Sequence, residues 1–129
     1  MTPIPYNHSI HWQQVKGWID ARQGTKSQGQ LQESMLSPLG LIIEGHCASW
    51  LMRVNGTSIA IIEPTTANPA LDQQTRSAAL DILIPDMLRL AQEHGVTRLI
   101  GMSYLPAIID RALALGFTIL PDTLFHKDL

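Results

Sequence analysis

The residues best suited to chemistry in this chain lie close together, between Gln74 and Ala79. The segment Gln74-Thr75-Arg76-Ser77-Ala78-Ala79 follows a loop and opens the longest helical pattern of the sequence. Small side chains there let backbone amides approach a ligand, and the unpaired N–H groups of a helix start, together with the helix dipole, favour a phosphate or diphosphate. The segment therefore predicts an anion site at the start of this helix.

The elements that must position this segment follow from the hydrophobic period. Apolar residues at spacings of three and four predict one helix from about Asn7 to Arg22 and a longer one that stops at His94-Gly95. Pro85 predicts a kink or a break in the longer helix, because proline removes one backbone hydrogen bond. The polar stretch from Gln23 to Gln32 reads as a flexible connection, followed by a helical turn through residues 33–36.

Short apolar or alternating runs predict three strands, at residues 41–43, 47–54 and 58–63. Asn55-Gly56 predicts a type I′ hairpin turn between the second and third. Pro64 and Pro69 are expected to end the third strand and to open the loop that leads to the longer helix.

The last third of the chain continues the alternation. Residues 96–102 read as a buried strand, and Pro106 opens a helix that ends at Gly116. Residues 117–120 and 124–125 read as two short strands joined by a Pro-Asp turn. The element order predicts a mixed sheet with helices packed on it.

Length and composition limit the possible functions. With 129 residues, the chain fits one domain, residues 1–129, and 45% apolar with 16% charged residues excludes wholesale disorder. A net charge of -2 without a Lys/Arg cluster argues against nucleic acid as a partner. Since there is one cysteine and no apolar run approaches the roughly 20 residues that span a bilayer, we expect a cytoplasmic protein without a membrane partner.

At the 74–79 segment the chain resembles the GNAT superfamily of N-acetyltransferases. The acetyl-CoA loop of that family follows the pattern Q/R-x-x-G-x-G/A, and Gln74, Ser77 and Ala79 occupy its three defining positions. The following order of a strand, a short helix and a Gly116-Phe117 corner is also similar, so the resemblance covers about residues 39–129. It implies an α+β fold in which a mixed, mostly antiparallel central sheet carries helices on both faces.

The resemblance also implies roles for individual residues. Backbone amides of Gln74 to Ala79 would hold the diphosphate of acetyl-CoA, which serves as cosubstrate, and the strand end at Ile62 would pair with the pantetheine arm. Glu63 is then the candidate base that deprotonates an amine. Ala112 stands where the family often has its tyrosine acid, so Tyr104 is the candidate replacement.

Two functions fit these residues. The first is transfer of an acetyl group from acetyl-CoA to a small-molecule or protein amine. The second is a noncatalytic GNAT-fold binding or assembly module, such as the small GNAT-like components of some phage particles, acting as a homo-oligomer or with an assembly partner. Ser77 in place of the first glycine and Ala112 favour the module, whereas Gln74, Ala79 and the order of elements favour the enzyme.

Ordinary structural roles remain open for the same residues. The 74–79 segment is also a normal helix start, Glu63 a solvated strand end, and Tyr104 a ring packed under a helix. His8 and His11 are three apart, but no third ligand follows, so no metal site is expected. Cys47 and His46 are strand neighbours that point to opposite faces, which favours a structural role for the cysteine.

Overall fold

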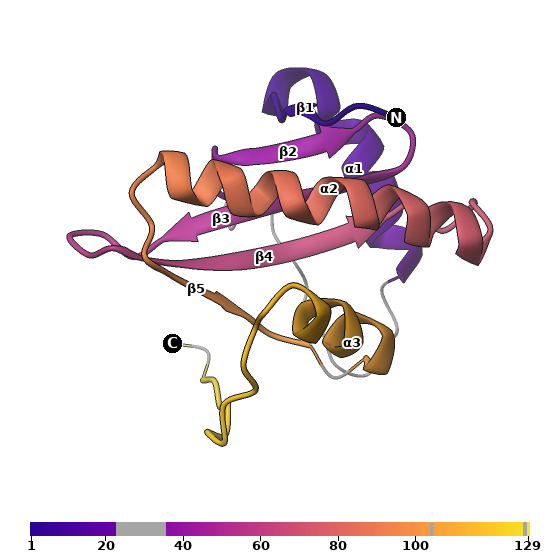
Figure 1. The fold of residues 1–129 in the computed structure, drawn as a ribbon. Coiled ribbons are helices and arrows are strands. Elements are labelled where there is room, and N and C mark those ends of the chain that lie inside the picture. The colour runs from indigo at the N-terminus through magenta and orange to yellow at the C-terminus, as the bar shows by residue number, and fades with distance from the viewer. Residues whose placement is uncertain (23–35, 104, 128) are drawn as a thin grey trace.

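The computed structural model describes residues 1–22, 36–103, 105–127 and 129 (Figure 1). The polar connection predicted from Gln23 to Gln32 lies outside the described residues, and so do Tyr104 and residues 33–35 of the helical turn predicted at 33–36. In the described part of the chain, no helix is both long and apolar enough to cross a membrane.

The sheet has five strands that lie side by side in chain order. They are β1 (Ile4–Pro5), β2 (Gly40–Ile43), β3 (Cys47–Arg53), β4 (Ile59–Ala67) and β5 (Arg98–Gly101). The pairs from β1 to β4 are antiparallel, and β5 runs parallel to β4. The sheet is therefore mixed and mostly antiparallel, as predicted.

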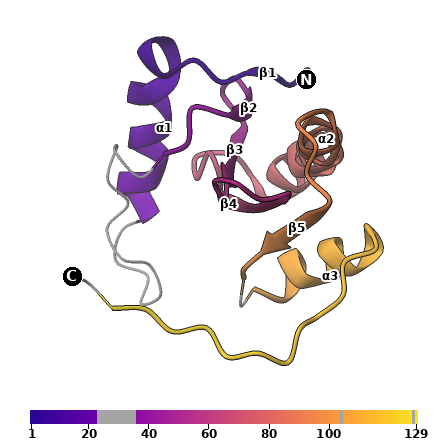
Figure 2. The same ribbon diagram turned by 90° about the vertical axis from the view of Figure 1, so that its left-hand side faces the viewer.

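Three helices complete the described fold: α1 (His8–Arg22), α2 (Gln73–Glu93) and α3 (Pro106–Ala114). Figure 2 shows α1 on one side of the sheet and α2 on the other. Each of these two helices closes a separate hydrophobic cluster against the sheet. This arrangement confirms the predicted α+β class with helices on both faces.

The predicted apolar face of α2 is its buried face. Ala79, Leu83, Met87 and Ala91 recur every four residues and are at most 3% exposed. They pack on Ile43, Cys47 and Leu51 of the sheet. Full burial of a side chain the size of Leu83 or Met87 contributes about 1.5–3 kcal/mol, so this stripe fixes α2 on the sheet.

The opposite face is built around Trp50, which is 0% exposed. It packs with Val15 and Trp18 of α1. The ring of Tyr6 meets Trp50 edge-on, with 5.0 Å between centroids. Trp18 and Trp50 are therefore core residues.

Two predictions about the β3–β4 region are wrong. The turn is not type I′, because Gly56 has a φ of 75° but Asn55 has no positive φ. The loop is longer than two residues, and both the backbone N–H and the hydroxyl of Thr57 donate to Val54 O. Nor does Pro64 end the strand, since β4 continues to Ala67.

Pro64 and Pro85 interrupt the secondary structure less than the sequence predicts. Between the pairs Leu51–Ile62 and Ser49–Thr65, β4 holds one residue more than β3, so Pro64 lies in a bulge where no ladder donor is needed. Pro85 lies inside α2, which runs unbroken to Glu93. Packing of Leu83 and Met87 on either side of Pro85 compensates for the lost hydrogen bond.

The C-terminal strands predicted at 117–120 and 124–125 are also absent: residues 117–127 form neither helix nor strand. The predicted strand at 96–102 shortens to β5, which is only half-buried because it lies at the edge of the described sheet. The C-terminal segment has high strand propensity but no sheet neighbour, so propensity alone does not make it a strand.

Candidate functional site

The candidate site begins at the N-terminus of α2. Asp72 is the N-cap, and its carboxylate accepts hydrogen bonds from Thr75 N and Thr75 Oγ1, both at 2.8 Å. These bonds lower the pKa of Asp72. The cap uses the Thr75 amide, and the Asp72 carboxylate also interacts with the amide of Gln74, so the first-turn N–H groups that a ligand would reach, those of Gln73 and Gln74, lie beside this carboxylate.

The six residues of the predicted anion segment lie in different surroundings. Gln74 and Ala78 are exposed, Thr75, Arg76 and Ser77 are half-buried, and Ala79 is 0% exposed in the core. Because α2 already begins at Gln73, the amides from Ser77 onward belong to the hydrogen-bond ladder of the helix. The structure thus places the available donors at Gln73 and Gln74, one turn before the small residues.

Arg76 braces the loop that leads into α2. Its Nη1 donates to Leu71 O at 2.5 Å and to Pro69 O at 3.4 Å. The Arg76 guanidinium therefore stabilises the loop before α2 by hydrogen-bonding two of its carbonyl oxygens.

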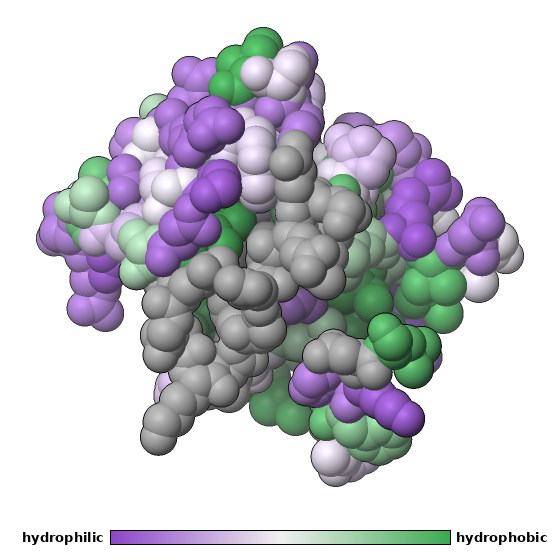
Figure 3. All heavy atoms as spheres, turned by 180° about the vertical axis from the view of Figure 1, so that it is seen from behind, coloured by the Kyte–Doolittle hydropathy of each residue, from purple (hydrophilic) through white to green (hydrophobic). Residues whose placement is uncertain are grey.

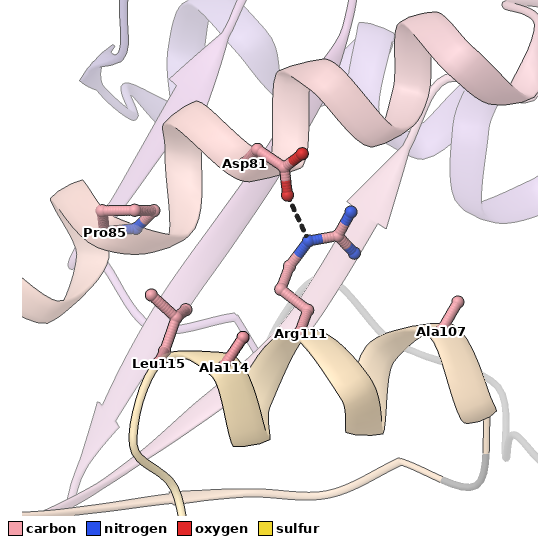
Figure 4. Close-up of a pocket in the computed structure, with 6 residues that line it drawn as sticks. All are labelled: Asp81, Pro85, Ala107, Arg111, Ala114 and Leu115. Carbon is pink, nitrogen blue, oxygen red and sulfur yellow. Dashed lines mark hydrogen bonds and ion pairs between the residues drawn. The ribbon is translucent and has the colours of Figure 1, made fainter.

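Two adjoining hollows lie along α2. The first, of about 550 Å³, is lined by Gln73, Gln74, Ser77, Ala78 and Asp81. The second, of about 310 Å³, lies between α2 and α3 and is lined by Asp81, Pro85, Ala107, Arg111, Ala114 and Leu115 (Figure 4). Asp81 lines both, so the two hollows adjoin at its side chain, and together they are called the groove.

Arg111 is the charged residue that sequence reasoning missed. Figure 4 shows it reaching from α3 toward α2, where its Nε donates to Asp81 Oδ1 at 2.7 Å. Its Nη2 donates to Ser77 Oγ at 2.9 Å and to Ser77 O at 3.4 Å. No local pattern signals this contact, because 34 residues separate Ser77 from Arg111 and only the packing of α3 beside α2 brings them together.

The second part of the site is the end of the pairing between β4 and β5. The parallel ladder runs from Ile59–Arg98 to Ile62–Gly101, after which β5 ends while β4 continues to Ala67. Residues 63–67 of β4 therefore have β3 on one side and no β5 residue on the other. In this stretch the Thr66 hydroxyl is buried without a hydrogen-bond partner among the described residues.

Glu63 lies at the β4 bulge, next to the last β5 pair. Its side chain is half-buried, and burial raises the pKa of its carboxyl. Its carboxylate makes no hydrogen bond or ion pair with any other residue in the described ranges, and burial is the sole cause of the shift. The structure brings Ile62 and Glu63 to the point where the strands separate, whereas Tyr104 lies outside the described residues.

The other candidate groups have structural partners. Cys47 is 0% exposed, and burial raises the pKa of its thiol to about 12. His46 Nδ1 lies 2.8 Å from Glu44 O. His11 accepts from Asn7 N at 2.9 Å through Nδ1 and donates from Nε2 to Glu44 Oε1 at 3.1 Å. The described residues hold no cluster of three His, Cys, Asp or Glu side chains that fits a metal ion.

Comparison with known proteins identifies the fold. No family model matches the chain, and neither does any curated protein. Among solved structures, the aminoglycoside antibiotic 6'-N-acetyltransferase AAC(6')-IG from Acinetobacter haemolyticus superimposes with a TM-score of 0.56 at 20% identity, covering 100% of this chain and 99% of that one. The aminoglycoside acetyltransferase meta-AAC0020 from an uncultured soil metagenomic sample, in complex with sisomicin, gives 0.59 at 14% identity, covering 99% and 94%.

These neighbours are acetyltransferases of the GNAT fold. Because each is less than 25% identical to this chain, the likeness shows the fold. The chain therefore has the GNAT fold, as its residues at 74–79 and 95–117 predicted.

Proposed function

We propose that this chain is a GNAT-fold acyltransferase that moves an acetyl group from acetyl-CoA to an amine. The observation that carries the proposal is the separation of β4 from β5 after Ile62–Gly101, at the end of β4 that leads through loop 68–72 into α2. An open strand edge and a helix N-terminus thus belong to one continuous segment. Together they suit a ligand that has both amide groups and a diphosphate.

The residues present fit acetyl-CoA in two places. The N–H groups of Gln73 and Gln74, with the dipole of a 21-residue helix behind them, would hold the diphosphate. The open edge of β4 from residue 63 to residue 67 would hydrogen-bond the amides of the pantetheine arm as an added strand does. The groove toward α3 would take the nucleotide end.

Glu63 would act as the base. Bound acetyl-CoA supplies an activated acyl thioester, and the amine must lose a proton before or during attack. A carboxylate whose pKa is raised by burial accepts that proton more readily near neutral pH than an ordinary glutamate does. Tyr104 is the residue proposed to return a proton to the leaving thiolate.

The acceptor class is proposed from the neighbours. Both neighbours described above are aminoglycoside acetyltransferases by name, and one is in complex with sisomicin. A polyamine sugar is therefore the first acceptor to test here, followed by other small amines and protein amines.

The decisive experiment titrates acetyl-CoA and follows melting temperature. A ligand at 100 times its Kd stabilises the folded state by about 2.7 kcal/mol, which raises the melting temperature of a domain this size by several degrees. Gln74→Glu should reduce the shift, because it places a negative charge beside the diphosphate at an exposed position. Gln13→Glu, at an exposed position on α1, is the matched control.

Transfer itself is measured as CoA thiol release across a panel of amines. No melting shift at about millimolar acetyl-CoA would reject the proposal, since a ligand that binds the folded chain at that concentration must stabilise it. A shift without thiol release from any amine would favour the noncatalytic module.

One observation favours that second function, a GNAT-fold binding or assembly module such as a phage particle component. Ser77, at the position of the first family glycine, is engaged by Arg111 through both its hydroxyl and its carbonyl oxygen. That contact fastens α3 to α2 beside the groove. In the module, the contact between Ser77 and Arg111 would serve only to hold α3 against α2. Removing that contact would then lower the stability of the fold without changing acetyl-CoA binding.

A further inference from the structure

The Arg111 side chain is less exposed than the other lysine and arginine side chains that form ion pairs in the described ranges. It is 16% exposed. Lys16 and Arg89, which pair with Asp20 and Asp86 within their own helices, are 49% and 69% exposed. Figure 3, the view from behind, shows hydrophilic side chains over much of the upper part of the molecule, where α1 faces the viewer. Lys16 on α1 is therefore an ordinary solvated cation, whereas the Arg111 guanidinium lies against the protein.

The Arg111 guanidinium has N–H groups that its present partners do not use. An arginine side chain carries five N–H donors in a fixed plane. Nε donates to Asp81 Oδ1, and Nη2 donates to Ser77 Oγ and, at the longer distance of 3.4 Å, to Ser77 O. Nη1 donates to no other residue in the described ranges. The guanidinium can therefore accept further oxygen partners beside the groove.

Asp81 and Ser77 are weak partners for this cation. The Asp81 carboxylate is 62% exposed, so water screens its charge and competes for its oxygens. Ser77 offers only uncharged oxygens. Arginine and phosphate form bidentate, charge-assisted hydrogen bonds that are roughly twice as strong as neutral ones. A phosphate group that enters the groove would therefore replace one or both of these partners.

The position of Arg111 suits a ligand that begins at the start of α2. Ser77 lines the hollow of about 550 Å³ and Arg111 the hollow of about 310 Å³, and Asp81 lines both. Figure 4 shows the guanidinium between α3 and α2, directed at Asp81. Ser77 follows Gln74 by three residues, which is roughly 4.5 Å along a helix axis. A ligand whose diphosphate lies at Gln74 can therefore place a phosphate group beside Arg111.

We propose that Arg111 binds a phosphate group of the acyl carrier and exchanges its present partners, Asp81 and Ser77, for phosphate oxygens. This inference rests on the proposed function, and it names the side chain that distinguishes acyl carriers with phosphate from acyl thioesters without it. Asp81 and Ser77 hold the guanidinium in place before the ligand arrives, and they compete with the ligand for its N–H groups. The phosphate comes either from the diphosphate or from the 3'-phosphate of the nucleotide, and the test separates these two sources.

The test measures Kd by calorimetry for acetyl-CoA, acetyl-dephospho-CoA and S-acetylpantetheine. Arg111→Gln should weaken acetyl-CoA binding by about tenfold or more, because a charged hydrogen-bond donor is lost, and should leave S-acetylpantetheine binding unchanged. Arg89→Gln is the matched control, since it removes the same charge and also breaks an ion pair with an aspartate, at an exposed position of α2. If the effect of Arg111→Gln vanishes with acetyl-dephospho-CoA, Arg111 binds the 3'-phosphate. If the effect persists, Arg111 binds the diphosphate.

Ser77→Ala provides a second test that keeps the guanidinium. Loss of the competing hydroxyl should tighten acetyl-CoA binding by about twofold to tenfold, opposite in sign to the effect of Arg111→Gln. If Arg111 only held α3 against α2, neither variant would change Kd. Melting temperatures measured without ligand establish that both variants fold.

Three results would overturn the inference: unchanged acetyl-CoA affinity in Arg111→Gln, an equal loss in Arg89→Gln, or weaker binding in Ser77→Ala. Titration of inorganic diphosphate into wild type and Arg111→Gln separates this inference from the proposed function. Binding of diphosphate that depends on Arg111, without binding of acetyl-CoA, would reject the proposed function and support the phosphate role of Arg111. Binding of neither ligand would overturn both.

Discussion

The hydroxyl of Ser77 accepts a hydrogen bond of 2.9 Å from Nη2 of Arg111, which joins the second turn of α2 to α3. In the GNAT pattern, the position of Ser77 is a glycine. The Ser77 side chain, which departs from the GNAT pattern, therefore has a structural role, because it holds the Arg111 guanidinium at the edge of the groove. The same guanidinium is a potential phosphate ligand, since it carries several N–H donors in a plane.

Asp81→Asn should tighten acetyl-CoA binding. Asp81 lines both hollows and pairs with Arg111 Nε at 2.7 Å. Replacing its carboxylate removes a negative charge that would repel the phosphates and frees the guanidinium to turn toward them. We expect Kd to fall by about threefold to tenfold, measured by calorimetry.

Asp20→Asn serves as the control for charge alone. Asp20 also forms an ion pair, with Lys16 Nζ at 2.6 Å, but on α1. Both substitutions change net charge equally. Each replaces a carboxylate that is well exposed, 47% for Asp20 and 62% for Asp81, so each should alter stability by about 1 kcal/mol or less. Equal effects of the two variants on Kd would contradict a local role for Asp81.

Glu63→Gln should abolish most acetyl transfer while sparing the fold. Loss of a general base lowers the rate by about 10²–10⁴-fold. Since burial raises the pKa of Glu63, the wild-type rate should increase with pH through a value above the ordinary 4.5. The measurement is a pH profile of CoA thiol release, with Glu93→Gln, an exposed residue at the end of α2, as control.

The same shift predicts how stability depends on pH. A carboxyl whose folded pKa is raised binds its proton more tightly when folded, so the free energy of unfolding falls as pH rises through the window above 4.5. Glu63→Gln should remove that decrease. If wild type and variant have parallel stability profiles, Glu63 is not desolvated in solution.

Asp72 predicts the opposite pH dependence. Hydrogen bonds from Thr75 lower its pKa below the ordinary 3.8, so its contribution is present above that value and is lost as pH falls through the folded pKa. Asp72→Asn keeps a capping side chain but removes the titrating group. Thermal unfolding between about pH 2 and pH 7 should show a weaker loss in acid for the variant than for wild type.

Gly40→Ala should destabilise the sheet strongly. A Cβ at Gly40 would lie 2.6 Å from Ser49 O and 2.7 Å from Trp50 Cδ1, and neither the strand backbone nor the buried indole can yield easily. We expect a loss of about 1–3 kcal/mol or more, as for overpacking in a core. Gly17→Ala, in α1, meets nothing within 4 Å and should instead stabilise by about 0.5–1 kcal/mol.

Denaturant unfolding of both glycine variants provides the check. A Gly40→Ala protein as stable as wild type would mean that β2 and β3 pair in another register. Gly17→Ala reports the helix propensity of α1 in the same assay.

Leu83→Ala should cost about 2–5 kcal/mol, because Leu83 is 0% exposed in the α2 stripe and its loss leaves a cavity. Ile82→Ala removes a similar side chain one residue earlier, where the residue is 38% exposed. The smaller cost of the second variant, read from midpoints of chemical unfolding, would confirm which face of α2 packs on the sheet.

The sequence predicted elements that depend on local pattern. The stripe of Leu83 and Met87, the strands of the meander and the stop at Gly95 follow from period and propensity, and the structure has them all. The strand end predicted at Pro64 and the helix break predicted as one alternative at Pro85 are absent, because the effect of a proline depends on its surroundings, a bulge in one case and core packing in the other.

The site was harder to predict than the fold. The sequence locates the start of α2 only to within one helical turn. An uncertainty of one turn decides which residues face solvent, because Gln74 is exposed whereas Ala79 is buried. Arg111 could not be found, because its contact with Ser77 joins residues far apart in the chain. Strand propensity at residues 117–120 could not show whether a partner strand is present.

The pairing of β4 with β3 on the side opposite its open edge has one more consequence. Residues 65–67, which follow the bulge at Glu63 and Pro64, stay extended through their pairing with β3, whatever lies along their other edge. A ligand that binds along this open edge meets main-chain groups that are already ordered. Binding therefore costs little conformational entropy of the β4 backbone. Selectivity at this edge should then depend on how well the amide groups of the ligand match the fixed spacing of the main-chain N–H and C=O groups of β4. Flexible acyl carriers that lack such amides should be poor competitors.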